Sequence, residues 1–215
     1  MTIDDIDTRI DQLAQRDDND FQVLRAPDTF APAKPLYILI HPGDVVQKHD
    51  DLDSCDEDVH EQIFDYSQRC QEIMGTELLG LDTGKWDVAI LHRQSTAYTF
   101  CNQVDVDDDY HDAIDRMNDD ENAAILYGDD LDAAANYFLD TMQARDRPLV
   151  VIAGAWSHLD GGCVEIVGKR LDQAGVAIKS SLGTCISPDG SEDEWIPAGG
   201  RADDADFAAF SSPAP

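Results

Sequence analysis

The sequence predicts an α/β protein with a three-layer, doubly wound, mostly parallel sheet of about five or six strands, of Rossmann-like type. Three observations support this fold class. Short apolar runs recur along the chain, amphipathic helical stripes lie between them, and the two kinds of segment alternate. Alternation of strands with helices is typical of a parallel sheet that is covered by helices.

The predicted strands are five short apolar runs, at residues 36–40, 88–91, 123–127, 149–153 and 176–178. Most of these runs are continuous and do not alternate with polar residues, as expected of strands buried on both faces. The segment 93–107 is long for a connection between a strand and a helix. We therefore expect an additional edge strand at residues 96–100.

The predicted helices are recognised from apolar residues at helical spacing. The stripes are Val59, Ile63, Tyr66, Cys70 and Ile73; Tyr110, Ile114 and Met117; Leu131, Ala135, Phe138 and Met142; and Val164, Val167, Leu171 and Ala174. Ser54 followed by Glu57 predicts the start of the first of these helices, and Gly75 predicts its end. Asp129 or Asp130 is the expected cap of the third, and Gly175 ends the last.

The two ends of the chain differ from this central pattern. Residues 1–35 are predicted to form an amphipathic helix, with Ile3, Ile6, Ile10 and Leu13 on one face, followed by a Pro-rich linker. The helix is either a docking arm or an oligomer contact. Residues 36–187 form the α/β domain, and residues 188–215 are predicted to be an acidic, disordered tail in which Trp195 and Ile196 could attach part of the chain to the domain.

The charge is extreme, with 45 acidic residues against 15 basic ones and a net charge of −30. A small soluble domain ordinarily carries a net charge of magnitude roughly 2–8. Salt near 1 M shortens the Debye length to about 3 Å and removes most surface repulsion. The acids are spread between apolar runs, so the chain is not a disordered acidic segment. We therefore expect a halophilic, haloarchaeal type of protein that does not bind nucleic acid.

Other features limit the cellular setting. The sequence has neither a run of 18 apolar residues nor a basic, apolar leader, so we expect no membrane span, no secretory signal and a cytoplasmic location. The five cysteines form no CxxC pair, which disfavours a disulfide framework or zinc knuckle. No phosphate-binding motif occurs, and no cofactor is predicted.

The scarce basic and nucleophilic side chains follow the predicted strands. His41 and Asp44 follow the first strand, His92 and Arg93 the second, and Ser157 and His158 the fourth. Ligands of open α/β sheets bind beyond the carboxyl ends of the strands. His92, Arg93 and Ser157 are therefore candidate ligand-binding residues, and Arg93 could hold a carboxylate or phosphate. A salt bridge from Arg93 to a nearby Asp is the alternative.

Cys163 is the candidate nucleophile. It is predicted to lie in the first turn of a helix, where the helix dipole and backbone N–H groups favour the thiolate. His41, His158 or Asp44 could then act as general acid or base. The alternative is that Cys163 packs against the sheet as free cysteines often do.

The second half of the chain resembles the isochorismatase-like hydrolase family. The segment 148–154, Cys163-Val164 and the later Leu171, Gly175 and Val176 are similar to that family's strand, cysteine-valine helix start and following strand. The resemblance implies an isochorismatase-like parallel α/β fold, oligomerisation and a cysteine nucleophile for amide or related hydrolysis. It covers residues 36–187 in element order and about 50 residues in detail. Asp44 is the candidate for the family's catalytic Asp, and no lysine occurs from Trp86 to Gly168.

Three hypotheses follow. The first is a cysteine-dependent small-molecule hydrolase that uses Cys163 with Asp44 or a rim histidine. The second is a non-catalytic binding or assembly subunit on the same scaffold, of host or viral origin, with a possible homo-oligomer or protein partner. The third is a metal-dependent enzyme that uses His41, His92 and His158; the spacings of the histidines and cysteines match no standard metal site, so no metal is the preferred prediction.

Overall fold

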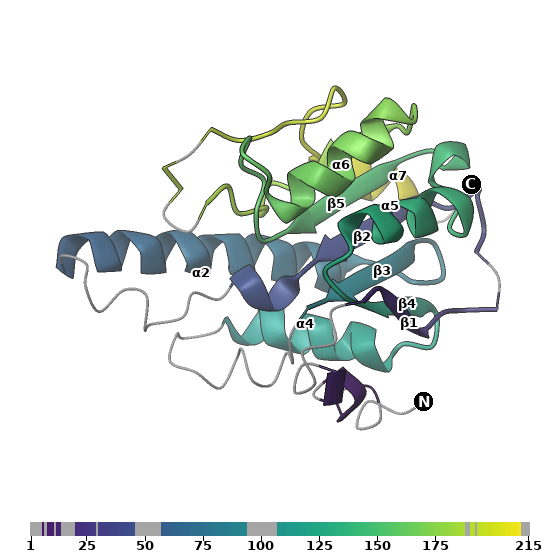
Figure 1. The fold of residues 1–215 in the computed structure, drawn as a ribbon, viewed down its shortest axis with the longest axis horizontal. Coiled ribbons are helices and arrows are strands. Elements are labelled where there is room, and N and C mark those ends of the chain that lie inside the picture. Colours follow the sequence, from purple (N-terminus) through teal and green to yellow (C-terminus); the bar gives the residue numbers. More distant parts are fainter. Residues whose placement is uncertain are drawn as a thin grey trace.

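The protein is an α/β protein with a six-stranded, mostly parallel sheet and flanking helices, which confirms the predicted class (Figure 1). The computed structural model describes residues 6, 8–10, 12–13, 20–28, 30–45, 57–93, 107–187, 190–191 and 193–211. The arrangement is consistent with a Rossmann-like fold. The predicted edge strand at 96–100 lies outside the described residues.

The strands run in the order β1-β4-β3-β2-β5-β6. They are β1 (Gln22–Arg25), β2 (Leu36–Ile40), β3 (Asp87–His92), β4 (Ala123–Tyr127), β5 (Val150–Gly154) and β6 (Ile178–Ser180). β1 pairs antiparallel with β4, and the other neighbours are parallel. The five predicted strands are all present, with β6 two residues later than expected. β1 was not predicted and lies within the segment expected to be a linker.

The two faces of the sheet are both buried. Along β2, Leu36, Ile38 and Ile40 pack with residues of α5 (Leu131–Asp140) and α6 (Cys163–Gln173), whereas Tyr37 and Leu39 pack with those of α2 (Glu57–Gly80) and α4 (Asp108–Asp119). Figure 1 shows α5 and α6 on one side of the sheet and α4 on the other. Burial on both faces explains why the strands are continuously apolar.

The helix α2 is longer than the sequence predicted, because Gly75 does not end it. A Cβ atom on Gly75 would lie 2.9 Å from the backbone N and Cα of Tyr110 in α4. The glycine therefore allows two helices to cross closely, and α2 continues to Gly80. The other helix signals hold within the described residues: Asp130 caps α5 through Ala133 N–H at 2.9 Å, and Gly175, with φ 81°, follows α6. The predicted cap Ser54 lies outside the described residues.

Both ends of the chain pack on the domain. Ile6, Ile10 and Leu13 are buried in the core cluster that also contains α2 and α4 residues. At the other end, Trp195 is 6% exposed and covers Gly168 of α6, where a Cβ would lie 2.2 Å from the indole ring. α7 (Asp204–Ser211) follows, and its Phe207 stacks on Trp86 with ring centroids 5.6 Å apart. Residues 193–211 are thus ordered against the domain where a disordered tail was predicted, although Ile196 is 49% exposed.

No helix in the described part of the chain is both long and apolar enough to cross a membrane.

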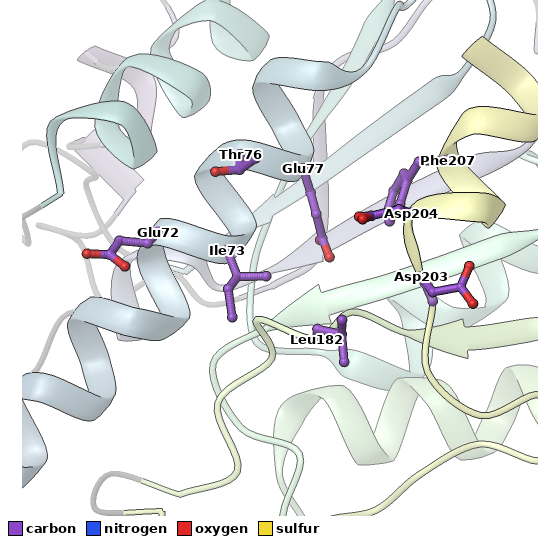
Figure 2. Close-up of a pocket in the computed structure, with 9 residues that line it drawn as sticks. Glu72, Ile73, Thr76, Glu77, Leu182, Asp203, Asp204 and Phe207 are labelled. Atoms are coloured by element: carbon purple, nitrogen blue, oxygen red, sulfur yellow. The ribbon is translucent and has the colours of Figure 1, made fainter. Parts of the chain in front are cut away.

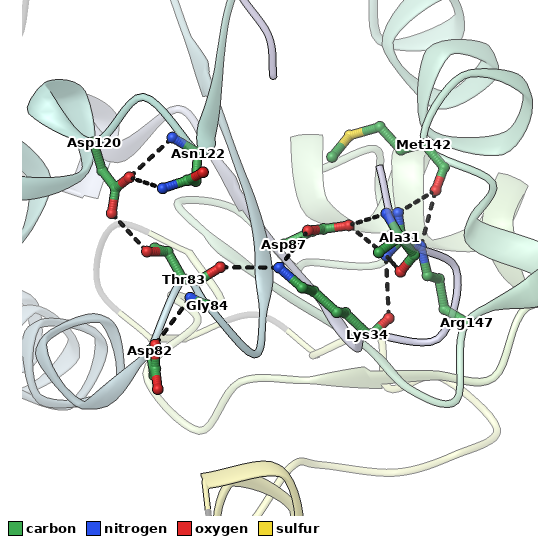
Figure 3. A network of polar contacts seen from close by, with 10 residues as sticks. All are labelled: Ala31, Lys34, Asp82, Thr83, Gly84, Asp87, Asp120, Asn122, Met142 and Arg147. Carbon is green, nitrogen blue, oxygen red and sulfur yellow. Dashed lines mark hydrogen bonds and ion pairs between the residues drawn. The ribbon is translucent and has the colours of Figure 1, made fainter. Parts of the chain in front are cut away.

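A buried arginine joins the linker to the sheet (Figure 3). Arg147, between α5 and β5, forms an ion pair with Asp87 at the start of β3. Its Nη1 also donates to the carbonyl oxygens of Ala31 (2.6 Å) and Lys34 (3.1 Å), and Nε and Nη2 donate to Met142 O at 2.9 and 2.7 Å. One side chain therefore connects the segment before β2, the start of β3 and the end of the α5 connection.

We expect the substitution Arg147→Met to lower the free energy of unfolding by about 3–5 kcal/mol, because it leaves the buried Asp87 charge without its main partner. Urea denaturation in molar KCl measures this effect. Arg145→Met is the matched control: Arg145 is exposed and donates to a single carbonyl oxygen, that of Ala174. Its substitution should change stability by no more than about 0.5 kcal/mol. Equal effects of the two substitutions would contradict the role assigned to Arg147.

Candidate functional site

The centre of the sheet has the geometry expected of a ligand crevice. β2 lies between β3 and β5, so the connections leave the sheet in opposite directions at the carboxyl ends of β2 and β5. His41 directly follows β2 and has φ 49°, which is uncommon for a residue other than glycine. Gly154 ends β5 with φ 145°, and a Cβ there would lie 2.2 Å from Ile40 O. Only glycine allows this approach of the two strand ends.

His41 and Arg93 both contact Asp129, which lies two residues beyond the end of β4. The Nε2 atom of His41 lies 3.2 Å from Gly128 O and 3.8 Å from Asp129 Oδ1, and Arg93 Nε lies 3.0 Å from the same carboxylate oxygen. A bond to a carbonyl oxygen requires the proton on Nε2 of His41. The ends of β2, β3 and β4 are thus joined by a polar network, and Arg93 forms the salt bridge that was the alternative to ligand binding.

The two rim histidines are neutral at neutral pH. Burial lowers the pKa of His41 to about 4, partly offset by the bond to Gly128 and by Asp129. Burial likewise lowers the pKa of His92 to about 4, and the nearby His41 lowers it further. The Nε2 atom of His92 lies 3.1 Å from Asn118 Oδ1 of α4. These contacts make both histidines part of the domain's interior.

Ser157 and His158, beyond β5, hold the C-terminal segment. The buried hydroxyl of Ser157 donates to Trp195 O at 2.9 Å, and Trp195 N–H donates to Ser157 O at 2.6 Å. His158 forms an antiparallel bridge with Glu194. Ser157 and His158 thus contact the C-terminal segment, whereas the network at Asp129 joins the ends of β2, β3 and β4.

Cys163 is the first residue of α6, as predicted, and is partly buried against the core cluster on the α5 and α6 face. Gly162 is the N-cap residue and supplies no side-chain cap. Val164 N–H donates to Trp156 O at 2.8 Å, which fixes the turn before the helix. Asp44 lies in the 3-10 helix η1 (Pro42–Val45), and its side chain lies outside the described part of the structure.

Among the described residues, no group of three or more His, Cys, Asp or Glu side chains is arranged to hold a metal ion. The hypothesis of a metal site built from His41, His92 and His158 therefore receives no support from their geometry.

A cavity of about 400 Å³ lies between α2 and the start of α7 (Figure 2). This cavity was not predicted from the sequence. Acidic and apolar side chains line it together: Glu72, Ile73, Thr76, Glu77, Leu182, Ala202, Asp203, Asp204 and Phe207. Its size falls within the range of small-molecule sites. The described lining contains four carboxylates and no Lys, Arg or His.

Glu77 is the most constrained of these carboxylates. Its Oε2 atom accepts hydrogen bonds from the hydroxyls of Tyr37 and Ser181, each at 2.7 Å. Burial raises the pKa of Glu77 above its usual 4.5, against the opposing effect of the two hydroxyls and of the backbone N–H of Leu182, and the neighbouring Asp204 raises it slightly further. A sequence signal did exist, because Glu77 continues the apolar stripe of Tyr66, Cys70 and Ile73 at helical spacing.

Comparison of the chain with protein-family models, with curated proteins and with solved structures found no match.

We expect acid to destabilise the fold through His41 and His92. Their folded pKa values, about 4, lie below the ordinary value of 6.5, so the unfolded chain binds more protons between these limits. The free energy of unfolding should fall as the pH drops from 6.5 to 4, by up to about 3 kcal/mol for each histidine. Urea denaturation across this range in molar KCl measures the slope.

His41→Gln and His92→Gln should each flatten this pH dependence, whereas His111→Gln should leave it unchanged. His111 is the matched control because it lies on the surface of α4, beside Asp115. An unchanged slope in both buried variants would mean that other groups cause the acid sensitivity.

Proposed function

We propose that this protein binds a small organic cation in the cavity between α2 and α7. The observation that carries the proposal is the carboxylate of Glu77, which is half-buried beside the cavity and has no ion-pair partner among the described residues. Buried charges are normally paired, because their removal from water is otherwise costly. A ligand cation would supply the missing charge.

The electrostatics of the cavity support a cation over an anion. Glu72, Asp203 and Asp204 add their charges to that of Glu77, and the described lining offers no basic side chain to an anion. The raised pKa of Glu77 reflects mainly the removal of its charge from water, with a smaller contribution from Asp204. A bound cation would lower that cost, so ligand binding and deprotonation of Glu77 favour each other.

The remaining lining supports an apolar body on the ligand. Ile73, Leu182 and Phe207 line the same cavity, and Figure 2 shows Glu77 between Ile73 and Phe207. An inorganic cation gains nothing from contact with these side chains, whereas an alkyl or aryl amine buries apolar surface against them. We therefore assign the ligand class as primary amines that carry an apolar group.

This proposal develops the hypothesis of a non-catalytic binding subunit. Two of the predicted site residues, Ser157 and Arg93, have partners within the fold that account for their positions. Helices on both faces and the strand order support a three-layer, doubly wound scaffold. The net charge of −30 supports a protein that works in molar salt, as in the cytoplasm of a halophilic archaeon.

A second candidate function is hydrolysis by Cys163 on the opposite face of the sheet, on an isochorismatase-like scaffold. The observation that favours it is the position of the thiol at the first residue of α6, where the helix dipole favours a thiolate. His41, His158 or Asp44 would then serve as acid or base. The absence of lysine between Trp86 and Gly168 weighs against a triad of the family's type.

The test of cation binding uses phenethylamine and its uncharged analogue 2-phenylethanol, measured by calorimetry in molar KCl. We expect the amine to bind and the alcohol to bind at least about tenfold more weakly, since a charge-assisted hydrogen bond contributes about 1.5–3 kcal/mol. Glu77→Gln should remove the preference for the amine. Amine affinity should also weaken as the pH falls through the pKa of Glu77, which lies above 4.5.

Glu61→Gln is the matched control, because Glu61 is exposed on the same helix and does not line the cavity. It should leave amine binding unchanged. Equal binding of amine and alcohol, or equal loss in the Glu61 and Glu77 variants, would refute the proposed site.

The test of the second candidate is the pH dependence of alkylation of Cys163 by iodoacetamide in the folded protein, followed by peptide mass spectrometry. A hydrolytic nucleophile requires labelling of Cys163 with a midpoint well below pH 8, because only the thiolate reacts. Labelling that rises only near the ordinary thiol pKa of about 8.5 would leave hydrolysis without a nucleophile. The variant Cys163→Ser identifies the signal.

A further inference from the structure

Two buried thiols lie together on the face of the sheet that α2 covers. Cys70 belongs to α2 and is 5% exposed, whereas Cys185 follows β6 and is 1% exposed. Both are free cysteines and both belong to the same core cluster. Each thiol shifts the pKa of the other, which places the two side chains close enough to interact. The proposed functions above use neither residue.

The fold holds the two segments against each other. Gly183 makes this approach possible, because a Cβ there would lie 2.9 Å from Cys70 O and 2.9 Å from Met74 N. Two residues later, Cys185 N–H donates to Gly154 O at 3.1 Å, and Ile186 N–H donates to the hydroxyl of Tyr66 at 2.5 Å. Cys185 is therefore fixed between the end of β5 and one turn of α2, opposite Cys70.

We propose that Cys70 and Cys185 form a redox pair, in which a hydroperoxide oxidises the two thiols to an intramolecular disulfide. The site is independent of the amine cavity and of Cys163. It would couple α2 covalently to the chain that follows β6.

The environment assigns different roles to the two sulfurs. Hydrogen bonds from Cys185 and Tyr66 lower the pKa of Cys70 against the effect of burial, and Arg69 and Arg201 act in the same direction. The bond to Cys70 raises the pKa of Cys185, and burial raises it further. Cys70 is therefore the attacking thiolate, and Cys185 is the resolving thiol that keeps its proton until the second step.

The reaction balances in two steps. The Sγ atom of Cys70 attacks one peroxide oxygen, the O–O bond breaks, and the alkoxide leaves as an alcohol after it takes the proton that Cys70 released. Cys70 is now a sulfenic acid. The Sγ atom of Cys185 then attacks the sulfur of Cys70, the S–O bond breaks, and the hydroxyl group leaves as water with the proton of Cys185. Two thiols supply the two electrons that reduce the peroxide.

The test treats the folded full-length protein with hydrogen peroxide in molar KCl, blocks the remaining thiols with N-ethylmaleimide and maps the peptides without reduction. We expect one linked peptide pair that contains Cys70 and Cys185, a loss of two thiols per chain, and full reversal by dithiothreitol. Cys70→Ser and Cys185→Ser should each abolish the linked pair, and Cys163→Ser should leave it unchanged.

A second measurement separates the pair from general thiol reactivity and does not require a cysteine variant to fold. Tyr66→Phe removes a donor to Cys70, so the linked pair should form several-fold more slowly at constant peroxide, because the thiolate fraction is smaller. Circular dichroism verifies that the fold is retained. The proposal fails if peroxide modifies Cys163 while Cys70 and Cys185 stay reduced. It also fails if Cys70 and Cys185 are oxidised separately and never become linked.

Discussion

The guanidinium group of Arg147 is the contact on which the amino-terminal edge of the sheet depends. It pairs with Asp87 and donates hydrogen bonds to carbonyl oxygens of the linker before β2 and of the segment that follows α5. The starts of β2, β3 and β5 are thereby set against one another, and the register of these three strands carries that alignment to their carboxyl ends. Salt screens a buried pair far less than exposed charges. The contact is therefore preserved at salt concentrations that screen the charges on the surface.

The acid surplus changes how a carboxylate is interpreted in this chain. In a chain with 45 acidic residues, the presence of a carboxylate does not by itself identify a functional group. Several carboxylates differ because the fold gives them specific surroundings, and three of them bear on the sites described above. Asp87 is buried with Arg147, Asp129 joins His41 to Arg93, and Glu77 is half-buried beside a cavity with no cationic partner in the described part of the chain. Burial and pairing, which only the structure supplies, separate these residues from the rest.

The carboxyl ends of the strands and the face of the sheet under α2 have different chemistry. The carboxyl ends of β2, β3 and β4 carry neutral histidines and a salt bridge whose bonds lie within the domain. The face under α2 carries the acidic cavity and the thiol pair, and α2 contributes Glu77 to the first and Cys70 to the second. The second half of α2 thus concentrates polar groups on a buried face, where each of them is costly unless it has a partner. That cost is the reason to expect a ligand at Glu77.

Local sequence patterns determined the elements of the fold, because hydrophobic periodicity and helix caps act over a few residues. The strands at 36–40 and 123–127, the Asp130 cap and the glycine after α6 follow from such patterns. They also determined that His41, Arg93 and Cys163 would follow strands or open a helix. The packing of the helices and of the C-terminal segment depended instead on contacts between residues far apart in the sequence.

The local sequence predicts a helix end at Gly75, whereas in the structure this glycine allows α2 to pass close to α4. The composition of the C-terminal segment predicts disorder, whereas in the structure Trp195 packs over Gly168. The cavity at Glu77 and the meeting of Cys70 with Cys185 join segments more than a hundred residues apart. Composition and spacing carry no information on such meetings, because only the packing of helices and strands brings these side chains together.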